Sequence, residues 1–209
     1  TLIVKIGSVE KSLSLETSND DSVIKFKYII EENLDDFNGV ELFTNINLPN
    51  SSILDYAGNP IVEDFSNLGV DISGIKVDST NPYITRVSSP QNGYYFPGDT
   101  LIFEVEFNEI VFNDPDPSAT SSLNILLGDQ TIQASYLSGS GTSLFKYSYT
   151  IINGDNDNNG LDLVSPLELN GFNLYDAVNN TANAEFIVPN LNNIRVDSGA
   201  PIVTQVIGP

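Results

Sequence analysis

The chain of 209 residues contains neither cysteine nor histidine. It therefore has no thiol nucleophile, no imidazole for acid–base catalysis and no disulfide. It also lacks the Cys and His side chains that usually hold zinc, haem or an iron–sulfur cluster. A surface protein avoids unwanted thiol chemistry in this way, so the composition is compatible with an extracellular location.

Basic residues are scarce as well. The chain has 8 Lys and Arg residues against 28 Asp and Glu residues, a formal net charge of −20. Such a charge repels nucleic acids and anionic membrane surfaces, whereas it is compatible with divalent cations. No run of 18 apolar residues is present, so we expect neither a nucleic-acid partner nor direct membrane insertion. The hydrophobic content of 40% is enough for a folded core.

A long internal repeat organises the chain. A shift of 121 positions superimposes Leu2 on Leu123, Gly7 on Gly128, Asp36 on Asp157 and Asp55 on Asp176. After a two-residue deletion the shift becomes 119, and Val77-Asp78-Ser79 falls on Val196-Asp197-Ser198. The repeat unit is therefore about 120 residues long and ends in a Val-Asp-Ser linker.

The repeat predicts three parts. Residues 1–78 form the last two-thirds of one unit, residues 79–198 form a complete unit, and residues 199–209 form a linker and the first strand of a next unit. The first part has no counterpart of residues 83–121. We therefore expect the chain to be a piece of a longer protein of neighbouring repeats.

Apolar residues alternate with polar ones along most of the chain. Leu101, Phe103, Val105 and Phe107 form one such series, which is typical of a half-buried strand. In the complete unit we expect strands over residues 83–89, 100–112, 122–128, 131–137, 143–152, 172–176 and 184–195, and no helix longer than one turn. This pattern predicts an all-β fold of antiparallel β-sandwiches, the first incomplete at its N-terminus.

Several segments resemble the tandem bacterial Ig-like repeats of large surface proteins and adhesins. Residues 92–101 (NGYYFPGDTL) are similar to the family's "DGxYxxGDTI" opening, and residues 134–150 are similar to its "ATYxSGSGTSTLTFxYTV" segment. Gly154-Asp155 matches the following "GD", and residues 55–59 (DYAGN) and 176–180 (DAVNN) match "DAAGN". The resemblance implies an Ig-like fold, a cell-surface location and a stalk-like array.

One acidic loop is a candidate calcium site. Asp155, Asp157, Asn159 and Asp162 supply oxygen atoms at nearly alternate positions around Gly160. Such oxygens suit Ca²⁺, although Pro166 replaces the final Glu of an EF-hand loop. The alternative is a plain turn, since Asp and Asn favour turns without any metal.

Strand alternation suggests further ligands. Asp99 and Asp197 are expected at the same end of the unit as this loop. At the junction between units, we expect Asp36, Asn38 and Asp78 of the first to face Asp114, Asp116 and Asp176 of the second. A divalent ion there would turn the repulsion between carboxylates into a rigid joint, by analogy with cadherin junctions.

Catalysis is not expected. Glu104, Glu106 and Glu109 alternate outward on one strand, which indicates a solvated sheet face rather than a glycosidase pair. We predict a structural stalk segment stiffened by Ca²⁺, with no receptor identified. One alternative is a self-assembling surface-layer or fibre subunit that pairs residues 199–209 with a neighbour by strand addition. Another is a carbohydrate-binding module that uses Tyr94, Tyr95 and Phe96.

Overall fold

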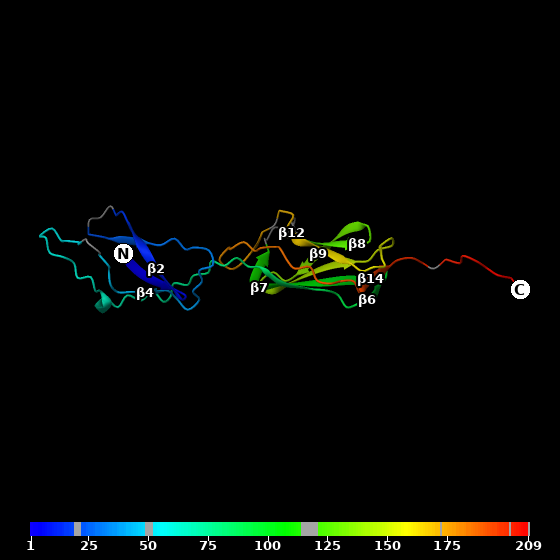
Figure 1. Ribbon diagram of the computed structural model, residues 1–209, viewed down its shortest axis with the longest axis horizontal. Helices are drawn as coiled ribbons and strands as arrows, with labels where there is room; N and C mark the ends of the chain where they lie inside the picture. The colour runs from blue at the N-terminus through cyan, green and yellow to red at the C-terminus, as the bar shows by residue number, and fades with distance from the viewer. Residues whose placement is uncertain (19–21, 49–51, 114–120, 172, 201, 209) are drawn as a thin grey trace. The chain divides into compact units, whose positions relative to one another are not determined.

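The computed structural model describes the chain except for residues 19–21, 49–51, 114–120, 172, 201 and 209. The protein is all-β, as predicted, and a three-residue 3₁₀ turn at Ser66–Leu68 is its helical element among the described residues. It divides into two compact units, Thr1–Thr80 (unit 1) and Asn81–Pro209 (unit 2), which are coloured blue to green and green to red in Figure 1. No helix in the described ranges is long and apolar enough to cross a membrane.

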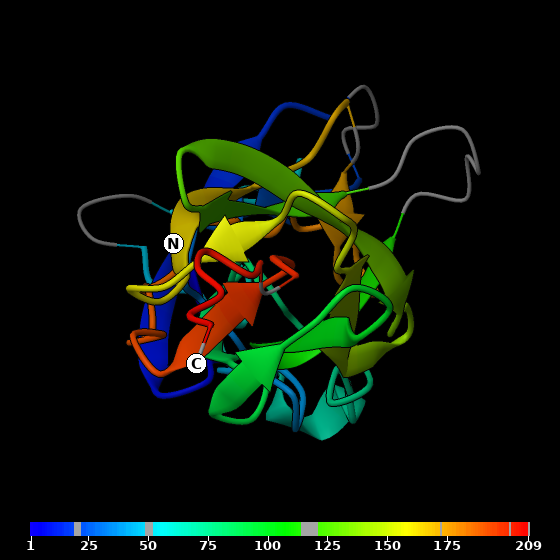
Figure 2. The ribbon, with the colours of Figure 1, turned by 90° about the vertical axis from the view of Figure 1, so that its right-hand side faces the viewer.

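Unit 2 is built on a seven-stranded antiparallel sheet that curls around its core (Figure 2). The order is β12-β8-β9-β10-β7-β13, and β5 also pairs with β7. The bounds are β5 Ile84–Ser88, β7 Thr100–Asn113, β8 Ser122–Leu127, β9 Gln130–Ser138, β10 Thr142–Thr150, β12 Asp162–Glu168 and β13 Leu174–Tyr175. A small sheet of β6 (Gly93–Tyr95), β11 (Asn156–Asp157) and β14 (Ile194–Asp197) closes one end.

The longest strand, β7, lies at the centre of the unit 2 core. Its alternate residues Leu101, Phe103 and Val105 are completely buried, because strand side chains point alternately to the two faces of a sheet. Facing residues of β8 and β10 are buried with them, and the rings of Phe107 and Phe145 meet edge to face at 5.3 Å. The alternation seen in the sequence therefore marks the core correctly.

Unit 1 repeats only part of this architecture. Its sheet has four strands in the order β3-β2-β1-β4, with bounds β1 Leu2–Ile6, β2 Val9–Glu16, β3 Lys25–Lys27 and β4 Glu41–Leu42. Through the repeat these strands correspond to β8, β9, β10 and the start of β12. The sheet ends at β3, where unit 2 continues into β7.

Three segments differ from the expected strands. The segment before β14 was expected to be extended from residue 184, but the strand begins only at Ile194. Strand β12, which contains Pro166, was not expected. Proline has no backbone N–H to donate to a neighbouring strand and is therefore tolerated on edge strands. Strand β12 is an edge strand, and its register to β8 shifts between Val164 and Glu168. Residues 202–208, expected to start a further strand, have no strand pairing.

Candidate functional site

Asp157 of the predicted calcium loop points into the protein. Its Oδ2 accepts the N–H of Gly128 at 2.7 Å, and its Oδ1 accepts the N–H groups of Asn159 and Gly160 at 3.1 and 2.8 Å. The side chain is 4% exposed. Because a buried carboxylate must have its oxygens satisfied, this residue ties its own loop to the β8–β9 turn.

Unit 1 contains the same arrangement around Asp36. Its Oδ2 accepts the N–H of Gly7 at 2.7 Å, and its Oδ1 accepts the N–H of Gly39 at 2.8 Å. The amide hydrogen bonds, that from Gly7 above all, hold the pKa of the Asp36 carboxyl below its usual range, against the opposing effect of burial. We call the Asp36 and Asp157 arrangements the turn clamps.

A second pair of aspartates organises two turns that begin with Asp and end with Asn four residues later, DYAGN in unit 1 and DAVNN in unit 2. In unit 2, Asp176 Oδ1 accepts the N–H groups of Val178 and Asn180 at 2.8 Å, and its Oδ2 accepts the Asn180 side-chain amide at 2.7 Å. In unit 1, Asp55 makes the equivalent bonds to Ala57 and Asn59. The Asn59 side chain, the largest contributor, lowers the pKa of the Asp55 carboxyl.

Asp155 forms part of the core boundary rather than an open loop. Its Oδ2 accepts the Tyr149 hydroxyl and the N–H of Ile152, both at 2.9 Å. Burial, and then the hydrogen bond to this carboxylate, raise the pKa of Tyr149 to about 12. The hydroxyl proton of Tyr149 is thus held in place to donate to Asp155.

The structure brings the predicted loop-end residues to one end of unit 2. Asp99 accepts the N–H of Phe96 through Oδ2, and its backbone carbonyl accepts the N–H of Ile151. Asp197 of β14 pairs with Asn156 of β11, directly beside the clamp. Asn159 and Asp162 are exposed at the same loop, and Asp162 Oδ1 accepts the N–H of Leu163.

These carboxylates lie near one another without forming a ready three-carboxylate cage. Within either unit taken alone, the described acidic side chains include no group of three whose oxygens lie within 4.8 Å of one another. Asp155, Asp157 and Asp176 accept hydrogen bonds from backbone amides and from neighbouring side chains. Chemically, the arrangement fixes the loops, which is the turn interpretation considered above.

One close carboxylate pair does occur at the opposite end of unit 2. A Glu109 oxygen of β7 and an Asp176 oxygen lie within 4.8 Å of each other, and Asp176 is 2% exposed. Two carboxylates at such a distance repel strongly unless a proton or a cation lies between them. The two carboxylates are therefore candidate ligands for a metal ion. The sequence identified Asp176 but assigned Glu109 to a solvated sheet face.

The remaining junction residues are placed in part. Asp114 and Asp116 lie outside the described residues. Asp78 follows Val77, whose backbone pairs with Asp36 in unit 1 through two hydrogen bonds of 2.7 and 2.9 Å, and Asn38 is exposed in the clamp loop. The predicted junction cluster draws on residues of both units and stays a prediction.

The other acidic residues of β7 form ion pairs. Glu104 contacts Lys146 at 3.0 Å and Glu106 contacts Arg86 at 2.9 Å, as expected for an exposed sheet face. The predicted aromatic platform is divided: Tyr95 packs against the core, whereas Tyr94 accepts a hydrogen bond from Arg195 at 3.1 Å and its ring lies 5.8 Å from that guanidinium.

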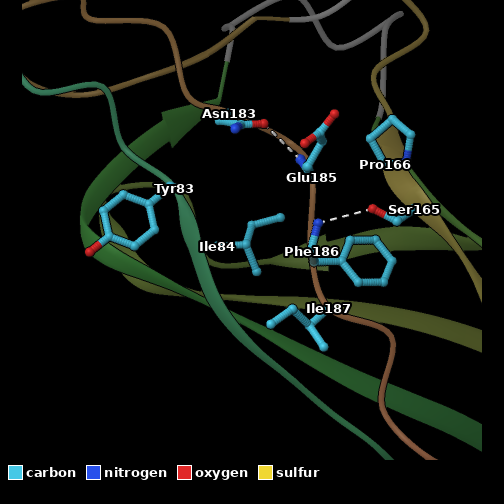
Figure 3. A pocket seen from close by; sticks show the side chains of 8 residues that line it. All are labelled: Tyr83, Ile84, Ser165, Pro166, Asn183, Glu185, Phe186 and Ile187. Carbon is cyan, nitrogen blue, oxygen red and sulfur yellow. Dashed lines mark hydrogen bonds between the residues drawn. The ribbon is translucent and has the colours of Figure 1, made fainter.

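A groove of about 450 Å³ lies on unit 2 away from these aromatics. Figure 3 shows Tyr83 on one side, Glu185 and Phe186 on the other, and Ile84 between them. Asn183 accepts the N–H of Glu185, and Ser165 accepts the N–H of Phe186, both at 2.9 Å. The groove therefore combines an exposed aromatic ring with a carboxylate, an amide and a hydroxyl.

Comparison of the chain with protein-family models, curated proteins and solved structures gives no match.

Proposed function

We propose that this chain is a stalk segment of a large extracellular bacterial surface protein or adhesin, made of tandem Ig-like domains and without catalytic activity. The observation that carries this proposal is the repetition of the turn clamp: Asp36 and Asp157 bind the same pair of glycine positions in both units. One chain with two units of the same local design is the organisation of a repeat array. Its acidic surface supports solubility of a long array.

The proposal includes Ca²⁺ as the ion that stiffens the array. Its support in unit 2 is the Glu109–Asp176 pair, because carboxylate oxygens are the hard ligands that Ca²⁺ prefers. Asp78, Asp114 and Asp116 of the predicted junction cluster, and the exposed oxygens of Asn159 and Asp162, are the further candidate ligands.

Thermal unfolding of the whole chain tests the ion. An ion that binds only the folded state stabilises it by about 2.7 kcal/mol at one hundred times its Kd. We expect Ca²⁺ added after EGTA to raise the melting temperature more than Mg²⁺ does. Glu109→Gln should reduce that rise, and Asp78→Asn should also reduce it if the linker takes part. The control Glu10→Gln removes the same charge from an exposed hairpin and should leave the rise unchanged. No rise at millimolar Ca²⁺ would remove calcium from the proposal.

Stiffening itself is measurable because the chain has no native cysteine. Spin labels at the exposed positions Ser12 and Thr131, introduced as Ser12→Cys and Thr131→Cys, report the distance between the two units. A stiffened stalk predicts a narrow distance distribution with Ca²⁺ and a broad one with EGTA. A broad distribution under both conditions would contradict a stiff segment and favour a flexible tether.

A second candidate function is carbohydrate binding, favoured by the groove in Figure 3. An exposed tyrosine ring beside carboxylate, amide and hydroxyl groups suits a sugar, which offers an apolar ring face and hydroxyls on its rim. Glycan-array binding that is lost in Tyr83→Ala and kept in Tyr94→Ala would support it. Silence of the array would reject it.

A further inference from the structure

Unit 1 leaves part of its apolar interior uncovered. Ile24 is 42% exposed, whereas its repeat equivalent Phe145 is completely buried. Leu15 is 69% exposed, and its equivalent Tyr136 packs against Phe145 with ring centroids 5.4 Å apart. These residues lie on the same face of the sheet as Val4 and Ile6 of β1, which are buried as their equivalents in β8 are. The difference is therefore confined to the β2–β3 end of that face.

Leu15 lines a hollow of about 440 Å³. Its apolar lining consists of Leu15, Phe26, Leu48 and Ile53, and we call these residues together with Ile24 the open face. In unit 2 the equivalents of Phe26 and Ile53 are Tyr147 and Leu174, both completely buried. The hollow thus marks a place that is filled in the complete repeat.

Strand β7 fills that place in unit 2. It pairs with β10 on one side, where Tyr147 lies opposite Phe103, and with β13 on the other, where Leu174 lies opposite Asn113. In unit 1 the strand equivalent to β10 is β3, and β3 has β2 as its only strand neighbour among the described residues. One edge of β3 therefore presents backbone N–H and C=O groups for another strand.

Charge specifies what kind of strand fits this edge. In unit 2, Lys146 lies opposite Glu104 and forms an ion pair of 3.0 Å with it. The equivalent residue Lys25 is exposed at the free edge of β3 and forms no ion pair with the described residues. A covering strand with a carboxylate opposite Lys25 and an apolar residue opposite Phe26 would complete both the charge pairing and the core.

We propose that the open face of unit 1 binds an added β-strand of alternating apolar and acidic residues, which pairs antiparallel with β3 and comes from polypeptide outside residues 1–209. The strand lies across Phe26 and Ile53 as β7 lies across Tyr147 and Leu174. Addition of an extended segment to a sheet edge gains affinity from main-chain hydrogen bonds and specificity from alternate side chains. This interaction is independent of calcium and of the stalk proposal.

A fluorescent peptide with the sequence of residues 99–113 is the probe, and the full 209-residue chain is the receptor. We expect saturable binding, with slowed hydrogen exchange at Lys25–Lys27 of β3. A peptide carrying Phe103→Ser should bind at least about tenfold more weakly, since it loses a buried aromatic side chain. Protection that appears in unit 2 instead, or no binding at 100 μM peptide (about the weakest Kd such a titration detects, −5.5 kcal/mol), would overturn the proposal.

A charge exchange provides the matched control without perturbing the core. Lys25→Glu in the chain should weaken binding of the unmodified peptide by about two- to fivefold. A peptide that carries Glu104→Lys should recover the lost affinity for this variant chain. Equal binding in all four combinations would reject the proposed register. The chain alone could instead form a stable oligomer that excludes the peptide and that dissociates when residues 201–209 are removed. In that case the strand that covers the open face is the tail of a second copy, and the proposal is wrong.

Discussion

Units 1 and 2 share their turns but not their cores. Both tie a loop to a hairpin through a buried aspartate, and both close a five-residue turn with an aspartate at its start and an asparagine at its end. Unit 2 surrounds β7 with a large buried cluster, whereas the buried cluster of unit 1 contains five residues, Val4, Ile6, Leu34, Val40 and Val77. Turn geometry is therefore encoded locally, while a closed core requires a strand contributed from far along the chain.

The largest expected effect comes from β7, which has no counterpart among the described strands of unit 1. Phe103→Ala removes a completely buried ring, and truncation of such a residue costs about 3–5 kcal/mol of unfolding free energy. Phe26→Ala acts on the open face and should cost only about 1 kcal/mol, because most of its surroundings are already open to water. Denaturant unfolding followed by tyrosine fluorescence measures both. Equal losses would mean that the unit 1 core is as closed as that of unit 2.

The turn clamp should matter less than the core. Asp157→Ala leaves three backbone N–H groups without their acceptor, and we expect a loss of about 2–3 kcal/mol. Asp157→Asn keeps the Oδ1 acceptor for Asn159 and Gly160 and loses mainly the bond from Gly128, so its loss should be smaller. If Asp157→Ala instead raised stability in the absence of Ca²⁺, the carboxylate would be a metal ligand rather than a clamp.

The strands could be predicted from the sequence to the extent that alternation determines burial. The series around Phe103 and Tyr147 identified strands and core together, whereas β12 was not predicted. That strand contains Pro166, which is acceptable there because β12 lies at an edge of the sheet.

The site was harder to predict than the strands. Asp155 and Asp157 have the composition of a calcium loop, but a side chain that turns inward to accept amide protons has the same sequence signature. Glu109 was missed because its proximity to Asp176 depends on how β7 meets the turn after β13.

The smallest expected effects are on the pH dependence of stability, at high pH in unit 2 and at low pH in unit 1. The pKa of Tyr149 is raised to about 12 in the folded state, against about 10 in an unfolded chain. Its stabilising contribution is thus complete below pH 10 and is lost as the pH rises from 10 through 12. Burial also raises the pKa of Tyr147, so absorbance at 295 nm should show late titration of both tyrosines. Tyr149→Phe should remove the part that titrates near pH 12 and reduce the alkaline loss of stability. An unchanged titration curve in that variant would contradict the assignment.

The decrease in stability at low pH should report on unit 1. Hydrogen bonds lower the pKa values of Asp36 and Asp55, so their contribution is present above the unfolded value near pH 4 and is lost as the pH falls through the lowered folded values.

Hydrogen exchange in the full chain tests the difference between the two units most directly. The amides of Lys25–Lys27 in β3 and of Lys146–Ser148 in β10 occupy equivalent repeat positions, but only β10 is covered by β7. We predict that the β3 amides exchange at least about a hundredfold faster, since exchange rates follow local opening free energies. Equal, strong protection of both sets would contradict the open face of unit 1.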